Sequence, residues 1–345
     1  MRLTFPGFID VHVHFRDPGV PEAETTASGL AAAAHGGFGA VVVMPNTMPP
    51  IDTVAAVRAQ YALAAAAASP VKMYSSACIS AGRSGEDCAE LEALAEAGAV
   101  FFTDDGAFVS DAKVMEEAMR RAADFNMVLS QHALAPGMSE ADCIRRDLSL
   151  CRETGCRLHV QHISTAAGVE LVRAAKREGL PVTAEATPHH LLLCRDDIVE
   201  GPAAGNFKMA PPLAGCEDRA EVRRGVKEGL LMFATDHAPH PAEKKLVAYD
   251  QAANGIVGLE TAIPITYHVM VEEEGMDVED WAAAWWKLPR DILSKGATGG
   301  EAALDGLMPT TVEIGVARKV DVAAFASRSR NCPYDGLEFT CWPAC

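Results

Sequence analysis

The chain has 345 residues, of which 49% are hydrophobic and 22% are charged, and its formal net charge at pH 7 is −17. This size and composition allow a large core in one or two domains. The acidic balance, without any run of basic residues, argues against binding to nucleic acid or to an anionic membrane surface. No apolar stretch reaches the roughly 20 residues of a membrane span. The ten cysteines are scattered without a signal peptide, which predicts a cytoplasmic protein with reduced thiols.

Strand-like apolar runs alternate with alanine-rich helical segments along most of the chain, which is typical of parallel βα units. Helical segments include residues 53–68, 87–97 and 112–124. Eight strands are expected, at residues 8–15, 40–46, 71–79, 99–104, 127–131, 157–163, 181–187 and 230–235. Eight such units predict an α/β fold with a closed (β/α)8 barrel, whose active site lies at the carboxyl ends of the strands. We assign residues 1–300 to the barrel and residues 301–345 to a C-terminal tail.

Two histidines at alternate positions end the first expected strand. Alternate side chains of a strand point to the same side, so His12 and His14 are placed to bind one metal ion. Two divalent ions bring four positive charges, against three negative charges from Asp105, Asp236 and a bridging hydroxide. The sequence therefore predicts a two-metal hydrolase centre. The six expected ligands, all at strand ends, are His12, His14, Asp105, His132, His162 and Asp236.

Other histidines are expected to take no part in the chemistry. His35 lies in a turn after a helix, His268 lies in a late helix, and His159 points away from the ligand side of its strand. His189 and His190 follow the seventh strand, where adjacent side chains diverge, so at most one of them faces the site. We interpret both as structural.

Several motifs, in the same order along the chain, resemble segments of the bacterial, barrel-type dihydroorotases of the amidohydrolase superfamily. They are PGFIDVHVHFRDPG at residues 6–19, MPNT at 44–47, TDDG at 103–106, HVQHIST at 159–165, ATDHAPH at 234–240 and GIVGLE at 255–260. The resemblance covers nearly the whole chain. It implies a TIM-like barrel of the metal-dependent hydrolase type that reversibly cyclises N-carbamoyl-L-aspartate to L-dihydroorotate, a step of de novo pyrimidine (UMP) biosynthesis.

The resemblance also implies cofactors and residue roles. Two Zn²⁺ per chain would be bridged by Asp105 and a hydroxide, and Asp236 would be both a metal ligand and the catalytic proton shuttle. Many relatives use a carboxylated lysine in the bridging position. This chain has a plain aspartate there and so resembles a bacterial subgroup that lacks the modified lysine. The motif favours Asp105 over Asp104, and we interpret Lys72, on the third strand, as a coincidental match to the lysine motif. The expected substrate-binding residues are His14, Arg16, Asn46, His240, Asn254 and Gly255.

The chain departs from the family pattern in four features. Its first strand begins within ten residues of Met1 and its C-terminal part is short, so the β-sandwich of the family is expected to be reduced or absent, with residues 301–345 as its remnant. Only 29 residues separate His132 from His162, so a helical excursion is expected to be trimmed. Ala210 stands where relatives often have Asn, and Asn254 is also unusual. These two changes are expected to alter substrate affinity more than metal chemistry.

Two alternatives stay open. Another cyclic amidohydrolase, an allantoinase or a hydantoinase, would share the metal ligands but not the carboxylate contacts of Arg16, Asn46 and His240. A non-catalytic scaffold for aspartate transcarbamoylase would be expected to have lost metal ligands, whereas this chain retains every one. We expect an active, homo-oligomeric enzyme with a small-molecule substrate, and leave open its association with the transcarbamoylase.

Overall fold

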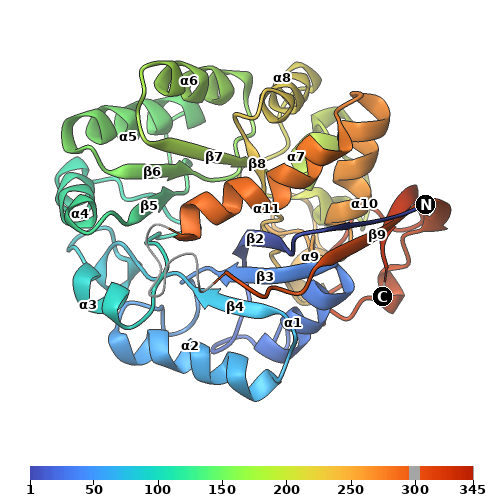
Figure 1. Cartoon of the computed structure of the whole chain (residues 1–345), viewed down its shortest axis with the longest axis horizontal. Helices are drawn as coiled ribbons and strands as arrows, with labels where there is room; N and C mark the ends of the chain where they lie inside the picture. Colours follow the sequence, from blue (N-terminus) through green and yellow to red (C-terminus); the bar gives the residue numbers. More distant parts are fainter. Residues whose placement is uncertain (295–303, 345) are drawn as a thin grey trace.

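The computed structural model describes residues 1–294 and 304–344. Its centre is a ring of short parallel strands surrounded by helices (Figure 1). A parallel bridge between Val13 and His237 brings the first and last strands of the ring together. The predicted α/β barrel is therefore confirmed. Its regular strands are β2 (Phe8–Val13), β3 (Phe38–Val43), β4 (Lys72–Ser75), β5 (Val128–Gln131), β6 (Arg157–Val160), β7 (Val182–Ala186) and β8 (Met232–Phe233).

The expected strand at residues 99–104 is not a regular strand. Phe102 alone forms bridges there, on one side to the segment after β4 and on the other to β5. A turn follows at once, because the hydroxyl of Thr103 accepts the backbone N–H of Asp105 at 3.1 Å. The fourth position of the barrel is thus closed by a single bridged residue, directly before the two aspartates.

Helices cover the outside of the barrel (Figure 1). Local signals set their ends: α5 begins after Ser139, whose side chain accepts the N–H of Asp142, and it ends at Gly155, which has a φ of +69°. The helices are α1 (Thr26–His35), α2 (Val54–Ala67), α3 (Leu91–Glu96), α4 (Ala112–Asp124), α5 (Glu140–Thr154), α6 (Ala166–Arg177), α7 (Pro188–Leu192), α8 (Cys216–Lys227), α9 (Ala242–Lys245), α10 (Ala262–Tyr267) and α11 (Val278–Ser294). Shorter helical turns are η1 (Ala81–Arg83), η2 (Arg195–Asp197), η3 (Ala204–Phe207), η4 (His268–Glu273) and η5 (Val322–Ala324).

Barrel strands are buried on both faces. In β3 and the residue that follows it, Ala40, Val42 and Met44 belong to one apolar cluster, whereas Val41 and Val43 belong to a second, larger one. This alternation follows from the pleat of the strand. It explains why these strands are continuous apolar runs in the sequence.

A second, antiparallel sheet lies beside the barrel. Its strands, in the order β1 (Arg2–Phe5), β9 (Thr310–Lys319) and β10 (Glu338–Pro343), bring both ends of the chain together (Figure 1). Phe5 packs on Phe8 and Trp281 with ring centroids 5.8 and 6.0 Å apart, so this sheet shares its core with the barrel. Three strands agree with the expected reduction of the sandwich. β1 comes from before residue 300, and β9 and β10 come from after it, so this sheet is built from both parts of the chain. The division into a barrel of residues 1–300 and a tail of residues 301–345 therefore stays a proposal.

Cys194 and Cys216 form a disulfide, where the sequence predicted reduced thiols. They lie 22 residues apart, and they meet because the segment after α7 packs beside the first turn of α8. Spacing alone does not reveal such a pairing. The other cysteines of the described part of the chain carry free thiols.

Within residues 1–294 and 304–344, every helix is too short or too polar to cross a lipid bilayer.

Candidate metal centre

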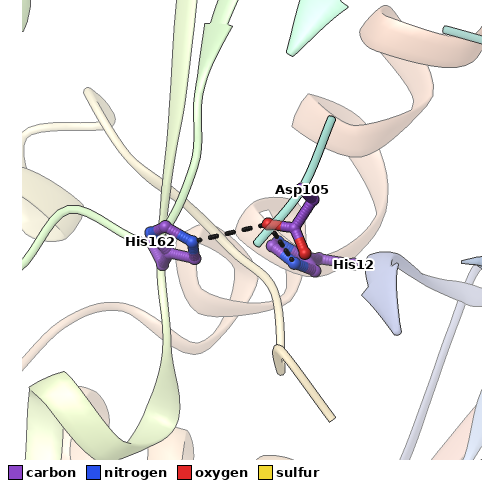
Figure 2. Close-up of side chains that lie close together, drawn as sticks. All are labelled: His12, Asp105 and His162. Atoms are coloured by element: carbon purple, nitrogen blue, oxygen red, sulfur yellow. Dashed lines mark ion pairs between the residues drawn. The ribbon is translucent and has the colours of Figure 1, made fainter. Parts of the chain in front are cut away.

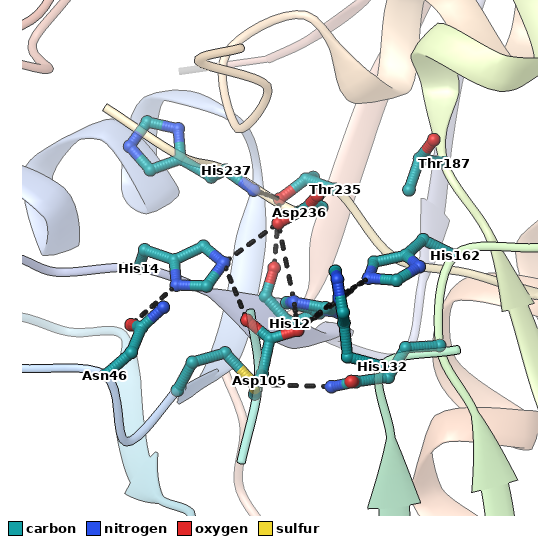
Figure 3. Close-up of polar contacts among 12 residues, drawn as sticks. His12, His14, Asn46, Asp105, His132, His162, Thr187, Thr235, Asp236 and His237 are labelled. Carbon is teal, nitrogen blue, oxygen red and sulfur yellow. Dashed lines mark hydrogen bonds and ion pairs between the residues drawn. The ribbon is translucent and has the colours of Figure 1, made fainter. Parts of the chain in front are cut away.

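The six predicted ligand side chains come together at the carboxyl ends of the barrel strands (Figure 3). Each follows or ends its strand, so the side chains converge from around the ring. All are buried, with at most 5% of their surface exposed. They are His12 in β2, His14 directly after it, Asp105 after the bridged residue Phe102, His132 after β5, His162 after β6 and Asp236 after β8.

Asp105 lies at the centre of this cluster. Its Oδ1 is 3.4 Å from both His12 Nε2 and His132 Nδ1, and 3.7 Å from His162 Nε2. Its Oδ2 is 3.4 Å from His14 Nε2. Figure 2 shows the carboxylate between the rings of His12 and His162. One carboxylate thus faces four imidazoles from three segments of the chain, which is the position that a bridging ligand requires.

Asp104, the neighbouring aspartate, points elsewhere. Its Oδ1 accepts the backbone N–H groups of Ile79 and Ser80 at 2.9 and 3.2 Å, and its Oδ2 accepts the Ser80 hydroxyl. Its carboxylate is therefore used to hold the loop after β4. Lys72 is also remote from the cluster, because it begins β4 and donates to the carbonyl of Asp305.

Asp236 forms the second carboxylate of the cluster. Its Oδ1 is 2.9 Å from His14 Nε2 and 3.4 Å from His12 Nε2. Asp236 and His162 both have positive φ values, of +48° and +31°. Non-glycine residues persist in this region mainly where the surroundings enforce it, commonly at functional sites.

The donor set fits metal ions. Three ligand atoms, one each from His12, Asp105 and His162, lie within 4.8 Å of one another, and so do three from His12, His14 and Asp236. His12 Nε2 and Asp105 Oδ1 are buried without a hydrogen-bond partner. Such atoms are costly to bury unless something binds their lone pairs, and a divalent cation does so.

Hydrogen bonds behind the cluster orient two of its rings. His12 Nδ1 donates to Glu185 Oε1 at 2.5 Å, and His14 Nδ1 donates to Asn46 Oδ1 at 2.9 Å. With Nδ1 of each ring held by this hydrogen bond, Nε2 faces the cluster and is the atom that would bind a metal ion. Glu185 also accepts the backbone N–H of His162 at 3.2 Å, and its other oxygen lies 3.0 Å from His159 Nε2. Glu185 therefore connects two ligand segments.

We expect Glu185→Ala to weaken metal binding by about 10- to 100-fold, because His12 loses the group that fixes its tautomer and orientation. Metal content per chain after dialysis against chelators of increasing strength measures this. Glu185→Gln, which keeps an acceptor oxygen, is the matched control and should lose less metal. Equal metal retention in the wild-type chain and in both variants would show that Glu185 has no such role.

The charges of the cluster favour metal binding. Burial opposes ionisation of Asp105, but the positive charge of His12 outweighs it and holds the pKa of Asp105 well below its usual range. Burial also opposes a charge on His12, but Glu185, Asp105 and Asp236 outweigh it and raise the pKa of His12 well above its usual range, so a metal ion would displace a proton from this ring. Burial likewise opposes ionisation of Asp236, and His12 and His14 overcome it to lower its pKa to about 2. Burial lowers the pKa of His132, which keeps that ring neutral. Anionic carboxylates and neutral imidazoles are the forms that ligate metals.

A cavity of about 290 Å³ opens above the cluster. Arg16 lines it, and its Nε donates to the carbonyl of Pro239 at 3.2 Å. Burial lowers the pKa of Arg16 to about 10, so its side chain stays charged at neutral pH. No carboxylate of the described residues lies within ion-pair distance of this charge. The predicted substrate-binding residues that line this cavity are His14, Arg16, Asn46, His240 and Asn254.

Gly255, the remaining residue of that set, is not among the residues that line the cavity. Its N–H donates to the carbonyl of Lys208, and its carbonyl accepts from Lys245 Nζ at 2.7 Å and from Asn331 Nδ2 at 3.0 Å. A Cβ at this position would lie 2.4 Å from the carbonyl oxygen of Ala238. The glycine is therefore needed for close packing of the loop that carries Asn254.

His190 has the structural surroundings expected for it. Its Nε2 donates to the carbonyl of Pro211 at 3.1 Å, and its Nδ1 accepts from the hydroxyl of Thr187 at 2.8 Å. Burial lowers the pKa of His190 to about 4, below the 6.5 of an unfolded chain. At His190, a proton therefore binds the unfolded chain more tightly than the folded one. The stability linked to this residue is present above pH 6.5 and is lost as the pH falls towards 4.

We expect this linkage to lower the free energy of unfolding by about 2 kcal/mol between pH 7 and pH 5. His190→Gln should remove that part of the pH dependence, measured by urea denaturation with the same metal loading. His35→Gln, at an exposed position, is the control and should keep it. A wild-type slope in the His190 variant would contradict the assignment.

Sequence reasoning missed two residues of this region. Glu185 lies in a buried strand between alanines, and a carboxylate in an apolar run is a signal that could have found it. Arg83 lines the cavity from the loop after β4, and a single arginine in a glycine-containing loop carries no distinguishing signal.

The fold and this cluster define a metal-dependent hydrolase built on an α/β barrel. Residues 1–139 match the dihydro-orotase-like family. A dihydroorotase from Listeria innocua serovar 6a is 39% identical over 373 aligned residues, which cover 99% of this chain and 85% of that protein. A dihydroorotase from Anaeromyxobacter sp. (strain K) is 40% identical over 365 residues, covering 97% of this chain and 82% of that protein. The chain belongs to the dihydroorotase family.

The fold is also shared with a solved cyclic amidohydrolase. The L-hydantoinase (dihydropyrimidinase) from Arthrobacter aurescens matches with a TM-score of 0.86 and 25% identity, over 99% of this chain and 83% of that protein. The barrel and the adjoining small sheet are thus part of an architecture common to enzymes that act on cyclic amides.

Proposed function

We propose that this chain is an active dihydroorotase that interconverts N-carbamoyl-L-aspartate and L-dihydroorotate in pyrimidine biosynthesis. In the direction of ring closure, the ureido nitrogen replaces a carboxylate oxygen and water is released. The observation that carries the proposal is the complete set of six ligand side chains directly below a cavity that contains Arg16. A cyclic amide with a carboxylate matches both parts of this site.

We propose that the cluster would hold two Zn²⁺ ions, and that Asp105, whose two oxygens face different histidines, would be the ligand common to both. Imidazole nitrogens and carboxylate oxygens suit zinc, and the two overlapping groups of ligand atoms support a pair of ions. When bound, the ions would polarise the ring carbonyl and lower the pKa of the attacking water towards neutrality. His12 belongs to both groups, and Glu185 holds its ring in place.

Asp236 is the proposed proton shuttle. It lines the cavity, and its pKa of about 2 keeps it ionised at neutral pH. In hydrolysis it accepts a proton from the attacking water and delivers it to the ring nitrogen as the C–N bond breaks. In synthesis it accepts the proton of the ureido nitrogen and donates it to the departing hydroxyl. One carboxylate therefore serves both directions.

Arg16 and Asn46 are the proposed donors to the substrate carboxylate. Asn46 uses Oδ1 to accept from His14, which leaves its Nδ2 protons for the substrate. His240 donates its Nε2 proton to the carbonyl of Asn254 at 2.8 Å. Burial, followed by the charge of Arg16, lowers the pKa of His240 to about 3, so its ring is neutral beside the carboxylate site.

The six proposed ligand side chains come from one chain, and five of them, all except His132, belong to the two groups of ligand atoms that lie close together. Assembly into a homo-oligomer and association with aspartate transcarbamoylase are proposed on the family resemblance alone.

The test is turnover by the purified, zinc-loaded chain on three cyclic amides: L-dihydroorotate, 5,6-dihydrouracil and hydantoin. The proposal predicts hydrolysis of L-dihydroorotate with a much larger kcat/KM than for the two rings that lack a carboxylate. Preference for hydantoin or dihydrouracil would instead support the hydantoinase alternative, which the similarity to the Arthrobacter aurescens structure keeps open.

A further inference from the structure

A second arginine lines the active-site cavity. Arg83 ends η1, in the loop after β4, and it is one of the residues that surround the 290 Å³ cavity together with Arg16. Within the described ranges, no carboxylate lies within ion-pair distance of Arg83, and its side chain has no hydrogen-bond partner. The protein has 47 acidic residues against 30 Lys and Arg, so an arginine beside a cavity without an acidic partner is unexpected.

The loop that carries Arg83 is firmly attached. Asp104 accepts two backbone N–H groups and the hydroxyl of Ser80, and Ser80 Oγ in turn accepts the N–H of Gly85 at 2.8 Å. Asp52 accepts the N–H of Gly82 at 2.8 Å. Asp104 directly precedes Asp105, the central carboxylate of the metal site. The position of the Arg83 backbone is therefore tied to that of the metal site.

The backbone of Arg83 is strained. Its φ is +57°, next to Gly82 at +61°. Glycine adopts this conformation without a steric penalty, whereas a residue with a Cβ does not. An arginine that keeps this conformation in an anchored loop, with its side chain at a cavity, indicates a function for the side chain.

Arg83 and Arg16 line the same cavity, and in the described part of the chain neither has a carboxylate within ion-pair distance. Two guanidinium groups at one cavity repel each other unless an anion lies between them. A carboxylate relieves this repulsion and accepts charge-assisted hydrogen bonds from both.

We propose that Arg83 is a specificity-determining residue that donates, together with Arg16, to the carboxylate shared by L-dihydroorotate and N-carbamoyl-L-aspartate. The inference rests on the proposed function. It adds a second cationic contact, from the loop after β4, to the donors expected from the sequence. The pair of arginines thereby favours carboxylated cyclic amides over uncharged ones.

The experiment compares Arg83→Gln and Arg83→Lys with the wild-type, zinc-loaded chain. We expect Arg83→Gln to raise KM for both substrates about 10- to 100-fold, with kcat within a few-fold of wild type, and Arg83→Lys to restore part of the affinity. The inhibition constant of uncharged 5,6-dihydrouracil should not change. Arg58→Gln removes one exposed positive charge from α2 and is the matched control, with an unchanged KM.

A third variant separates affinity from folding. Arg83→Gly removes the side chain and suits the positive φ, so its Tm should not fall, whereas its KM should rise as in Arg83→Gln. Wild-type KM values in Arg83→Gln would overturn the inference, as would an equal loss of affinity for dihydrouracil. Absence of dihydroorotate turnover by the wild-type chain would contradict the proposed function. Turnover by the wild-type chain with an unchanged KM in Arg83→Gln would contradict only the role of Arg83.

Discussion

Asp236→Asn should lower kcat for dihydroorotate hydrolysis by about 10³-fold or more, because the enzyme loses the group that moves the proton between water and the ring nitrogen. Asparagine keeps an oxygen at the position that now lies 2.9 Å from His14 Nε2. It also tolerates the φ of +48° found at this residue. The fold and most of the metal affinity should therefore survive the substitution.

Two measurements accompany the kinetics of this variant. Metal content per chain shows whether the centre remains loaded, and thermal unfolding shows whether the barrel is intact. A loaded, folded variant without turnover agrees with the proton-shuttle role. A loaded variant with wild-type kcat would exclude Asp236 as the shuttle.

Arg16→Ala should raise KM for dihydroorotate and for carbamoyl aspartate by about 100-fold, since hydrogen bonds to a charged group are worth about 1.5–3 kcal/mol each. The kcat should change much less, because the carboxylate is remote from the bond that breaks. Initial rates over a wide substrate range in both directions give the two parameters separately. Arg16→Lys is the matched control: it keeps the charge but loses the planar pair of donors, so its KM should be intermediate.

An unchanged KM in Arg16→Ala, or a fall in kcat without a rise in KM, would contradict the carboxylate-binding role. The same loss of affinity towards an uncharged cyclic amide would also contradict it.

The barrel and the clustering of the candidate ligand side chains were predictable because both depend on local patterns. Short apolar runs that alternate with alanine-rich helical segments identified the βα units, and a parallel barrel places all strand ends on one rim. His12, His14 and the later ligands therefore could be expected to converge, as they do. Residues 99–104 show the limit of this reasoning, because their apolar run is interrupted by the Thr103 turn that follows Phe102.

Contacts between distant segments could not be read from the sequence. Glu185 contacts His12, which lies 173 residues away in the sequence. The hydrophobic pattern of the sequence does not show which strands bring two such side chains together. The Cys194–Cys216 disulfide depends in the same way on how α7 packs against α8. Gly255 was expected to bind substrate because it belongs to a matching motif. Its backbone N–H and carbonyl are instead hydrogen-bonded within the protein, to Lys208, Lys245 and Asn331.

The most direct test of the account is a metal titration of the chelator-treated, metal-free chain, with dihydroorotate hydrolysis followed by the ultraviolet absorbance of the ring amide. The account predicts that activity rises with added Zn²⁺ and reaches its plateau at two ions per chain. A chain that binds two zinc ions and does not hydrolyse dihydroorotate, or one that is fully active without metal, would contradict it.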